Sequence, residues 1–136
     1  MRRSLWLAAA TAAELAALPA LAQNAPPAVY TLSQAQDGAT VYTLHCASCH
    51  GARMEGDAGP PLRGHAFRQI TASQGLTAYK LLNIISQSEP EDLPGSLNQE
   101  QYGDVVAYIL QQNGYPAGRD SLSADSLNLR ELDLGQ

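Results

Sequence analysis

The sequence is poor in cysteine, in basic residues and in long apolar segments. Its 136 residues include two cysteines, enough for one disulfide at most. Eight Lys and Arg residues stand against 13 Asp and Glu residues, and a formal charge of −5 argues against nucleic acid and anionic membrane surfaces as partners. No segment has the pattern of a convincing strand. The length fits one domain once any targeting segment is set aside.

Residues 1–22 have the pattern of a secretory signal peptide. Arg2 and Arg3 precede an apolar run over residues 5–13, and a small-residue pattern ends at Ala22. The run is too short for a membrane anchor and a proline follows it, so we expect cleavage after Ala22, a periplasmic location and no transmembrane span. This segment contains two of the eight basic residues and one of the 13 acidic ones, so the mature chain carries a formal charge of −6.

Both cysteines lie in one short motif, Cys46-Ala-Ser-Cys49-His50. A thioredoxin-type redox pair needs a βαβ context, which the missing strands exclude. A zinc site needs two more ligands, and no second Cys or His pair lies at ligand spacing. Covalent haem attachment is the interpretation that requires a histidine directly after the second cysteine. The motif therefore predicts one haem c, bound through Cys46 and Cys49 and ligated by His50.

The rest of the chain predicts a small all-α domain with long loops. Helices are expected from Ser33 into the haem motif, over residues 77–87 and over residues 98–114, with Thr77 and Asn98 as N-caps. Gln101 is placed to complete a capping box with Asn98, and Gly114 is expected to end the last helix. Residues 51–75, with five glycines and two adjacent prolines, and residues 88–97 are expected to be loops wrapped on a central group.

These motifs give the chain a resemblance to class I c-type cytochromes, in particular the single-haem group often encoded with periplasmic quinoprotein dehydrogenases. The matching stretches are Gly38-x-x-x-Tyr42, CASCHG at 46–51, GPPLRG at 59–64, PGSL at 94–97 and YGDVVAYILQQNG at 102–114. The resemblance implies a cytochrome c domain over residues 30–118, preceded by a flexible leader over 23–29. Residues 119–136 form a tail whose leucines could pack on the domain or dock a partner.

The resemblance also implies roles for individual residues. Gly38 resembles the glycine that lets the first and last helices cross closely, and Tyr42 and Tyr108 resemble the aromatic pair beside it. Pro60 resembles the residue whose carbonyl accepts a hydrogen bond from the ligating imidazole, which would orient His50. Arg63 is a candidate partner for a haem propionate, as is Arg68, although a solvated surface position is the favoured interpretation for both arginines.

The sixth iron ligand departs from the family pattern. The family has a methionine followed by proline in the loop before the last helix, and Glu89 stands there in this chain. Met54 lies only four residues after the proximal histidine, so we expect it to pack as an apolar side chain. Glu89 could ligate the iron or turn outward and leave the position open. His65 and Lys80 are weaker candidates, and His45, which directly precedes Cys46, is expected to lie at the surface.

The sequence therefore predicts an electron carrier rather than an enzyme, because no nucleophile or general-base constellation is present. The resemblance suggests a periplasmic dehydrogenase as donor and a terminal oxidase or another cytochrome as acceptor, and the chain could be a subunit of a dehydrogenase complex. The alternative is a haem protein with an open sixth position that binds small ligands or has peroxidase-like activity.

Overall fold

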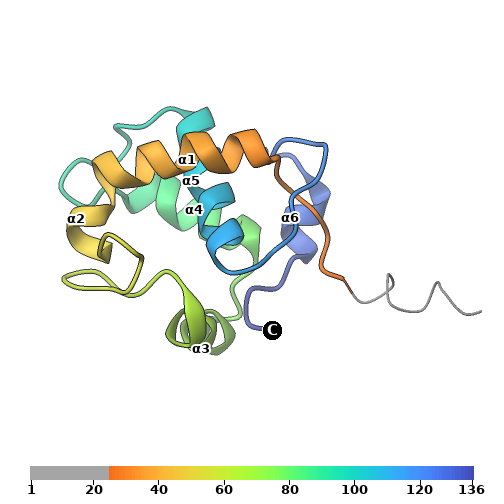
Figure 1. Cartoon of the computed structure of the whole chain (residues 1–136), viewed down its shortest axis with the longest axis horizontal. Helices are drawn as coiled ribbons and strands as arrows, with labels where there is room; N and C mark the ends of the chain where they lie inside the picture. The colour runs from red at the N-terminus through yellow and green to blue at the C-terminus, as the bar shows by residue number, and fades with distance from the viewer. Residues whose placement is uncertain (1–24) are drawn as a thin grey trace, which may run out of the picture.

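The computed structural model describes residues 25–136, so the predicted export signal lies outside the described residues. The helices in this part are α1 (Leu32–His45), α2 (Ala47–His50), α3 (Gly64–Gln74), α4 (Ala78–Ser88), α5 (Gln99–Gln112) and α6 (Leu127–Glu131) (Figure 1). Between residues 25 and 136 no strand forms, and one isolated bridge joins Thr77 to Asp133. The all-α prediction is confirmed.

The first long helix and the last long helix cross in direct backbone contact. At Gly38 of α1, a Cβ atom would lie 1.9 Å from the carbonyl oxygen of Asp104 in α5, so only glycine permits this approach. Beside the crossing, the rings of Tyr42 and Tyr108 meet edge to face with centroids 5.7 Å apart. The helix contact that the sequence resemblance implied is therefore confirmed.

Side-chain capping explains where three of the described helices begin: α1, α4 and α5. Thr77 accepts a hydrogen bond from the Lys80 amide at the start of α4. Asn98 and Gln101 form the reciprocal capping box that was predicted for α5. The prediction for α1 was wrong by two positions: Thr31, not Ser33, is the N-cap and accepts from the Gln34 amide.

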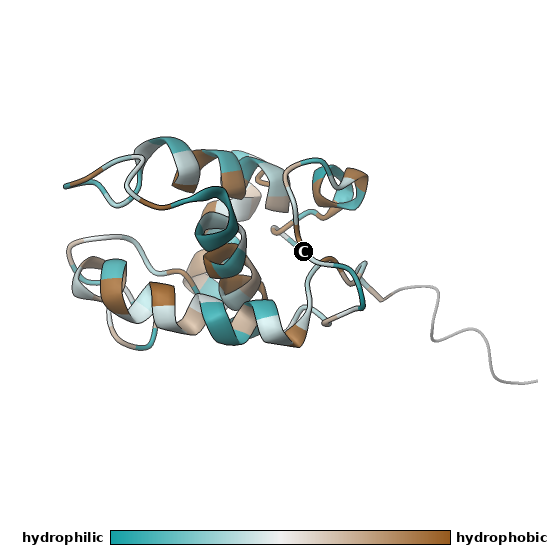
Figure 2. Ribbon diagram, turned by 90° about the horizontal axis from the view of Figure 1, so that it is seen from above, coloured by the Kyte–Doolittle hydropathy of each residue, from teal (hydrophilic) through white to brown (hydrophobic). Residues whose placement is uncertain are grey.

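Helix α3 lies inside the segment predicted to be a loop. Gly64 and Gly75 have positive φ angles of 72° and 57°, so the residues that looked like turns within a loop are the two ends of a helix. Its inward face is narrow, with Phe67 and Thr71 buried four residues apart. A stripe this narrow gives little periodic signal in the sequence. The helices contain both apolar and polar residues (Figure 2), as expected when one face of a helix is buried and the other is exposed.

The C-terminal tail packs along the domain. Four of its leucines are buried: Leu122, Leu129, Leu132 and Leu134. The Gln34 amide group of α1 both donates to the Leu122 carbonyl (3.0 Å) and accepts from its N–H (2.7 Å). The hydroxyl of Thr71, in α3, donates to the Leu134 carbonyl at 2.6 Å. The tail thus ties α1 to α3.

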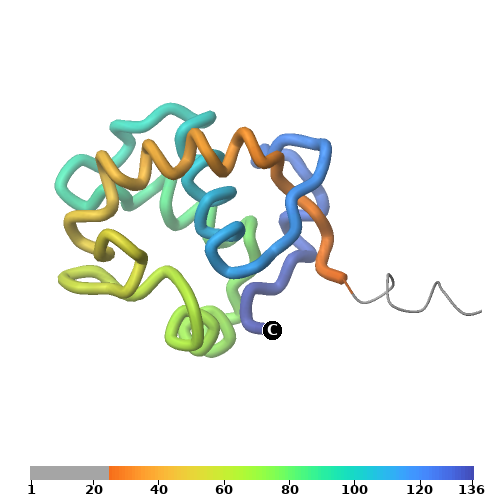
Figure 3. The backbone as a smooth tube through the Cα atoms, in the orientation of Figure 1, coloured from red at the N-terminus to blue at the C-terminus, as the bar shows by residue number. Residues whose placement is uncertain are grey.

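The start of the described chain lies beside the segment that follows α5 (Figures 1 and 3). Gly118 donates its N–H to the Tyr30 carbonyl at 2.7 Å, and the Tyr30 hydroxyl donates to the Tyr115 carbonyl at 2.6 Å. Val29, in the segment expected to be a leader, is 5% exposed. No helix within residues 25–136 has the length and apolar character needed to span a membrane.

Candidate haem-binding site

The cysteine–histidine motif lies where α1 ends and the short helix α2 begins (Figure 1). Cys46 is both the C-cap of α1 and the N-cap of α2. His50 is the last residue of α2, and its side chain is buried. The Nδ1 atom of His50 is 2.7 Å from the Pro60 carbonyl oxygen. A carbonyl can only accept, so Nδ1 carries the proton and Nε2 keeps the lone pair that a metal would need.

The loop after the motif is held close to the imidazole. The Gly59 N–H donates to the Cys49 carbonyl and the Gly56 N–H to the His50 carbonyl, both at 2.8 Å. A Cβ on Gly59 would lie 2.7 Å from Cε1 of His50, so the loop backbone lies against the ring. The orientation of His50 is therefore fixed from two sides, by a hydrogen bond and by backbone contact.

The two thiols form no disulfide; Cys46 is half-buried and Cys49 is exposed. Burial raises the pKa of the Cys46 thiol to about 11, and the nearby Glu89 carboxylate and Cys49 add to the increase. A raised pKa is the opposite of what a redox-active or nucleophilic cysteine needs. Within residues 25–136, no three His, Cys, Asp or Glu side chains gather as a metal site.

Two cavities meet at the motif. The inner one, of about 170 Å³, is mostly apolar and is called the slot here; its lining includes Leu62, Phe67, Leu81, Ile85, Val105 and Ile109. The outer one, of about 780 Å³, is called the mouth and includes Leu44, Cys49, Glu91, Asp92 and Leu93. Both are lined by Cys46, His50, Pro60 and Glu89.

These residues fit haem c. The group is a flat, largely apolar ring that needs an apolar slot, two thiols at its edge and an imidazole nitrogen free to ligate iron. The slot, the pair Cys46 and Cys49, and Nε2 of His50 supply these three requirements within one pair of connected cavities.

The other candidate residues lie away from the slot. Arg63 and His65 are exposed and line neither cavity, and His45 lines only the mouth. Lys80 donates to the Gly75 carbonyl at 2.7 Å. Met54 is 1% exposed and also lines neither cavity, so it packs in the core as expected for a non-ligating methionine.

Asn113, which the sequence analysis did not single out, fastens the loop that borders the slot. Its Nδ2 donates to the carbonyls of Leu62 (2.9 Å) and Ile109 (2.8 Å), and its Oδ1 accepts from the Gly64 N–H at 3.0 Å. One side chain at the end of α5 thus holds the start of α3. Its position directly before Gly114 is the only sequence signal that marks it.

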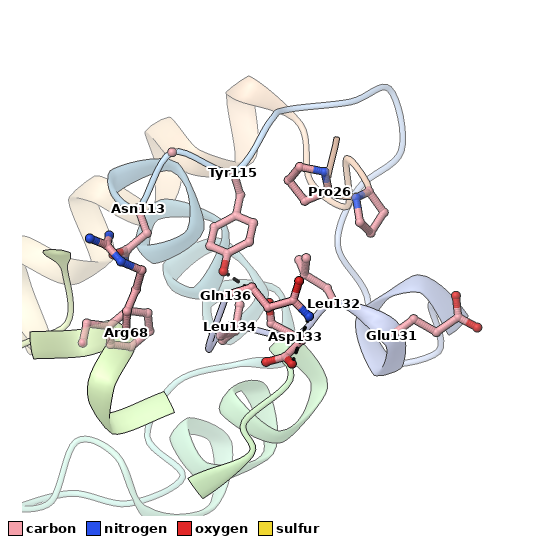
Figure 4. A pocket seen from close by; sticks show the side chains of 12 residues that line it. Pro26, Arg68, Asn113, Tyr115, Glu131, Leu132, Asp133, Leu134 and Gln136 are labelled. Atoms are coloured by element: carbon pink, nitrogen blue, oxygen red, sulfur yellow. Dashed lines mark hydrogen bonds between the residues drawn. The ribbon is translucent and has the colours of Figure 1, made fainter. Parts of the chain in front are cut away.

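A separate cavity of about 480 Å³ lies between α3 and the tail (Figure 4). Arg68, Tyr115 and Gln136 line it, and the Tyr115 hydroxyl donates to the Asp133 carbonyl at 3.4 Å. Phe67 lines both this cavity and the slot, so its ring forms part of the wall between them. Arg68 therefore lies on the tail side of this wall.

Comparison with solved structures shows the fold. The sulfane dehydrogenase SoxCD from Paracoccus pantotrophus matches with a TM-score of 0.52 at 20% identity, covering 74% of this chain and 58% of that one. The thiosulfate dehydrogenase TsdBA from Marichromatium purpuratum matches at 26% identity with a TM-score of 0.42, too low to carry an argument, covering 62% of this chain and 20% of that one. The match thus spans less than two thirds of the first neighbour's chain and about one fifth of the second.

Among curated protein sequences, none matches this chain significantly. The family model for cytochrome c oxidase, cbb3-type, subunit III matches residues 33–109, which is more than half of the chain and includes the motif at Cys46, Cys49 and His50. The chain therefore belongs to this family of cytochrome c domains, whose cofactor is haem c.

Proposed function

We propose that this protein is a single-haem, class I type cytochrome that carries electrons, with haem c attached through Cys46 and Cys49 and ligated by Nε2 of His50. The observation that carries the proposal is the 2.7 Å hydrogen bond between His50 and the Pro60 carbonyl, at the edge of an apolar slot. Bound haem supplies a one-electron couple, which the surrounding protein tunes through ligand, burial and hydrogen bonding.

The protein's own groups would act by orientation and by exclusion of water. The Pro60 carbonyl holds the His50 imidazole in one tautomer and makes its Nε2 a stronger electron-pair donor to a metal. The Tyr42 hydroxyl donates to the Gly51 carbonyl at 2.6 Å, which fixes the turn that follows the histidine. The slot's apolar side chains would exclude water from a bound haem and so raise the free-energy cost of placing a charge on it.

The rim of the mouth supports a proposal about partners. Leu44 and Leu93 are 72% and 62% exposed at the rim, beside the exposed carboxylates of Glu91 and Asp92. An apolar centre with acidic neighbours suits a redox partner whose docking face is basic, and such an encounter is faster at low salt. We propose a dehydrogenase as donor and an oxidase or another cytochrome as acceptor, in the periplasm.

The domain organisation is part of the same proposal: a cleaved signal over residues 1–22, a leader over 23–29, the haem domain over 30–118 and a tail over 119–136. The buried tail leucines support a tail that stabilises the domain. Mass spectrometry of the secreted protein tests the cleavage, because the mature chain should begin at Gln23 and carry one haem.

A second function is favoured by one observation. Among residues 25–136 no methionine lines the slot, since the Met54 side chain is buried elsewhere. A weakly held sixth position would let the iron bind small ligands or react with peroxide, with Glu89 as a nearby acid–base group. Rapid carbon monoxide uptake by the reduced protein would support this function over simple electron carriage.

The test of the main proposal is production of the full chain in a host that attaches haem c. We expect a haem-stained band that survives denaturation, and a reversible one-electron titration. Cys46→Ser with Cys49→Ser should abolish covalent retention, while Ser48→Ala, inside the same motif, should leave it intact. A native chain that matures without haem would refute the proposal.

A further inference from the structure

The slot offers few atoms that could ligate iron on the side not taken by His50. Apart from the histidine, four side chains with donor atoms line it: Tyr42, Cys46, Gln74 and Glu89. The Tyr42 hydroxyl already donates to a main-chain carbonyl, and burial raises its pKa to about 12, so it is no phenolate. Cys46 is taken up by the proposed attachment, and Gln74 is an exposed neutral amide. Glu89 is left.

The backbone of Glu89 is held at the junction of α4 with the following loop. Its N–H donates to the Ile85 carbonyl at 3.0 Å as the C-cap of α4. Its carbonyl accepts from the Tyr102 hydroxyl of α5, also at 3.0 Å. Hydrogen bonds to α4 and α5 therefore fix the backbone position of Glu89.

Glu89 is a half-buried residue and lines both the slot and the mouth. Within residues 25–136 the Glu89 carboxylate forms no hydrogen bond, whereas the N–H and the carbonyl of the same residue are both hydrogen-bonded. Its carboxylate is therefore available as an oxygen ligand for a positively charged metal centre in the slot.

We propose that the Glu89 carboxylate is the distal oxygen ligand of the haem iron, opposite His50. The inference rests on the proposed function, because it requires haem in the slot. A hard, anionic oxygen prefers Fe(III) to Fe(II), so Glu89 sets a low reduction potential and favours a ferric resting state.

The test compares four proteins: wild type, Glu89→Gln, Glu89→Met and Glu100→Gln. Glu100 is the matched control, since it is an exposed glutamate of α5 that lines neither the slot nor the mouth. Each is purified with covalent haem, and the ferric absorption and electron paramagnetic resonance spectra and the midpoint potential are measured.

We expect Glu89→Gln to change the ferric spectra and raise the midpoint potential. Glu89→Met should raise it further and introduce the near-infrared charge-transfer band of a thioether ligand, whereas Glu100→Gln should match wild type. If haem is attached but the Glu89→Gln spectra and potential match wild type, the ligand assignment is wrong while the proposed function stands. If wild type attaches no haem, both are wrong.

Discussion

Replacing Gly38 by alanine should disrupt the helix crossing on which the domain is built. The new Cβ would lie 1.9 Å from the Asp104 carbonyl oxygen and 2.4 Å from its carbon, both backbone atoms that no side-chain rotation can move. An ordinary contact needs at least 3.4 Å, so α5 must retreat by about 1.5 Å. Overpacking of this kind lowers the free energy of unfolding by about 3 kcal/mol, and the better helix propensity of alanine offsets about 1 kcal/mol of that loss. The expected net loss is about 2 kcal/mol.

For a domain of this size, that loss corresponds to a fall in Tm of roughly 10 °C. Thermal unfolding of Gly38→Ala beside wild type, followed by circular dichroism, measures it. Gly103→Ala is the matched control within α5, because its Cβ would approach the Leu122 carbonyl oxygen no closer than 3.2 Å and needs only a small adjustment. A Gly38→Ala protein as stable as Gly103→Ala would refute the reasoning.

Three further predictions follow from individual contacts. Asn113→Ala should lower the free energy of unfolding by about 2 kcal/mol, because the Leu62 carbonyl and the Gly64 N–H lose their partner; urea denaturation measures the loss. Burial raises the pKa of Asp104 above its ordinary value of 3.8, so its stabilising contribution is present below that value and is lost as the pH rises through the raised pKa. Asp104→Asn should therefore lose less stability than wild type as the pH rises above 3.8 in paired urea titrations, and an unchanged pH profile would contradict this. Reversing the rim charges with Glu91→Lys and Asp92→Lys should slow electron exchange with a cationic ruthenium complex roughly tenfold at low salt and leave little effect at high salt, as measured by stopped flow.

The features that could be predicted from the sequence are those encoded by neighbouring residues. Thr77 and the pair Asn98 and Gln101 cap their helices because a side-chain oxygen reaches an amide three residues ahead, a relation visible in the sequence itself. The cysteine–histidine motif has the same local character. The hydrogen bond from His50 to the Pro60 carbonyl was implied only through the family resemblance, and the structure shows it.

The features that escaped prediction depend on contacts between distant residues. Helix α3 is fixed by Asn113, which lies 49 residues beyond Gly64 in the chain. The tail is held by backbone bonds such as that from the Ala78 N–H to the Leu132 carbonyl at 2.9 Å, and backbone groups leave no mark in the sequence. Arg63, the exposed N-cap residue of α3, stays a prediction as a propionate partner.

The pairing of Tyr30 with Gly118 has a consequence for how this domain can be combined with others. It brings the two ends of the 30–118 segment together, while α2 and its haem motif lie at the far side of the molecule (Figure 1). Domains whose ends meet are well suited to insertion and fusion, because an added chain enters and leaves at one point. Another protein joined at either end would leave the mouth uncovered, so the domain is suited to serve as an interchangeable electron-transfer module.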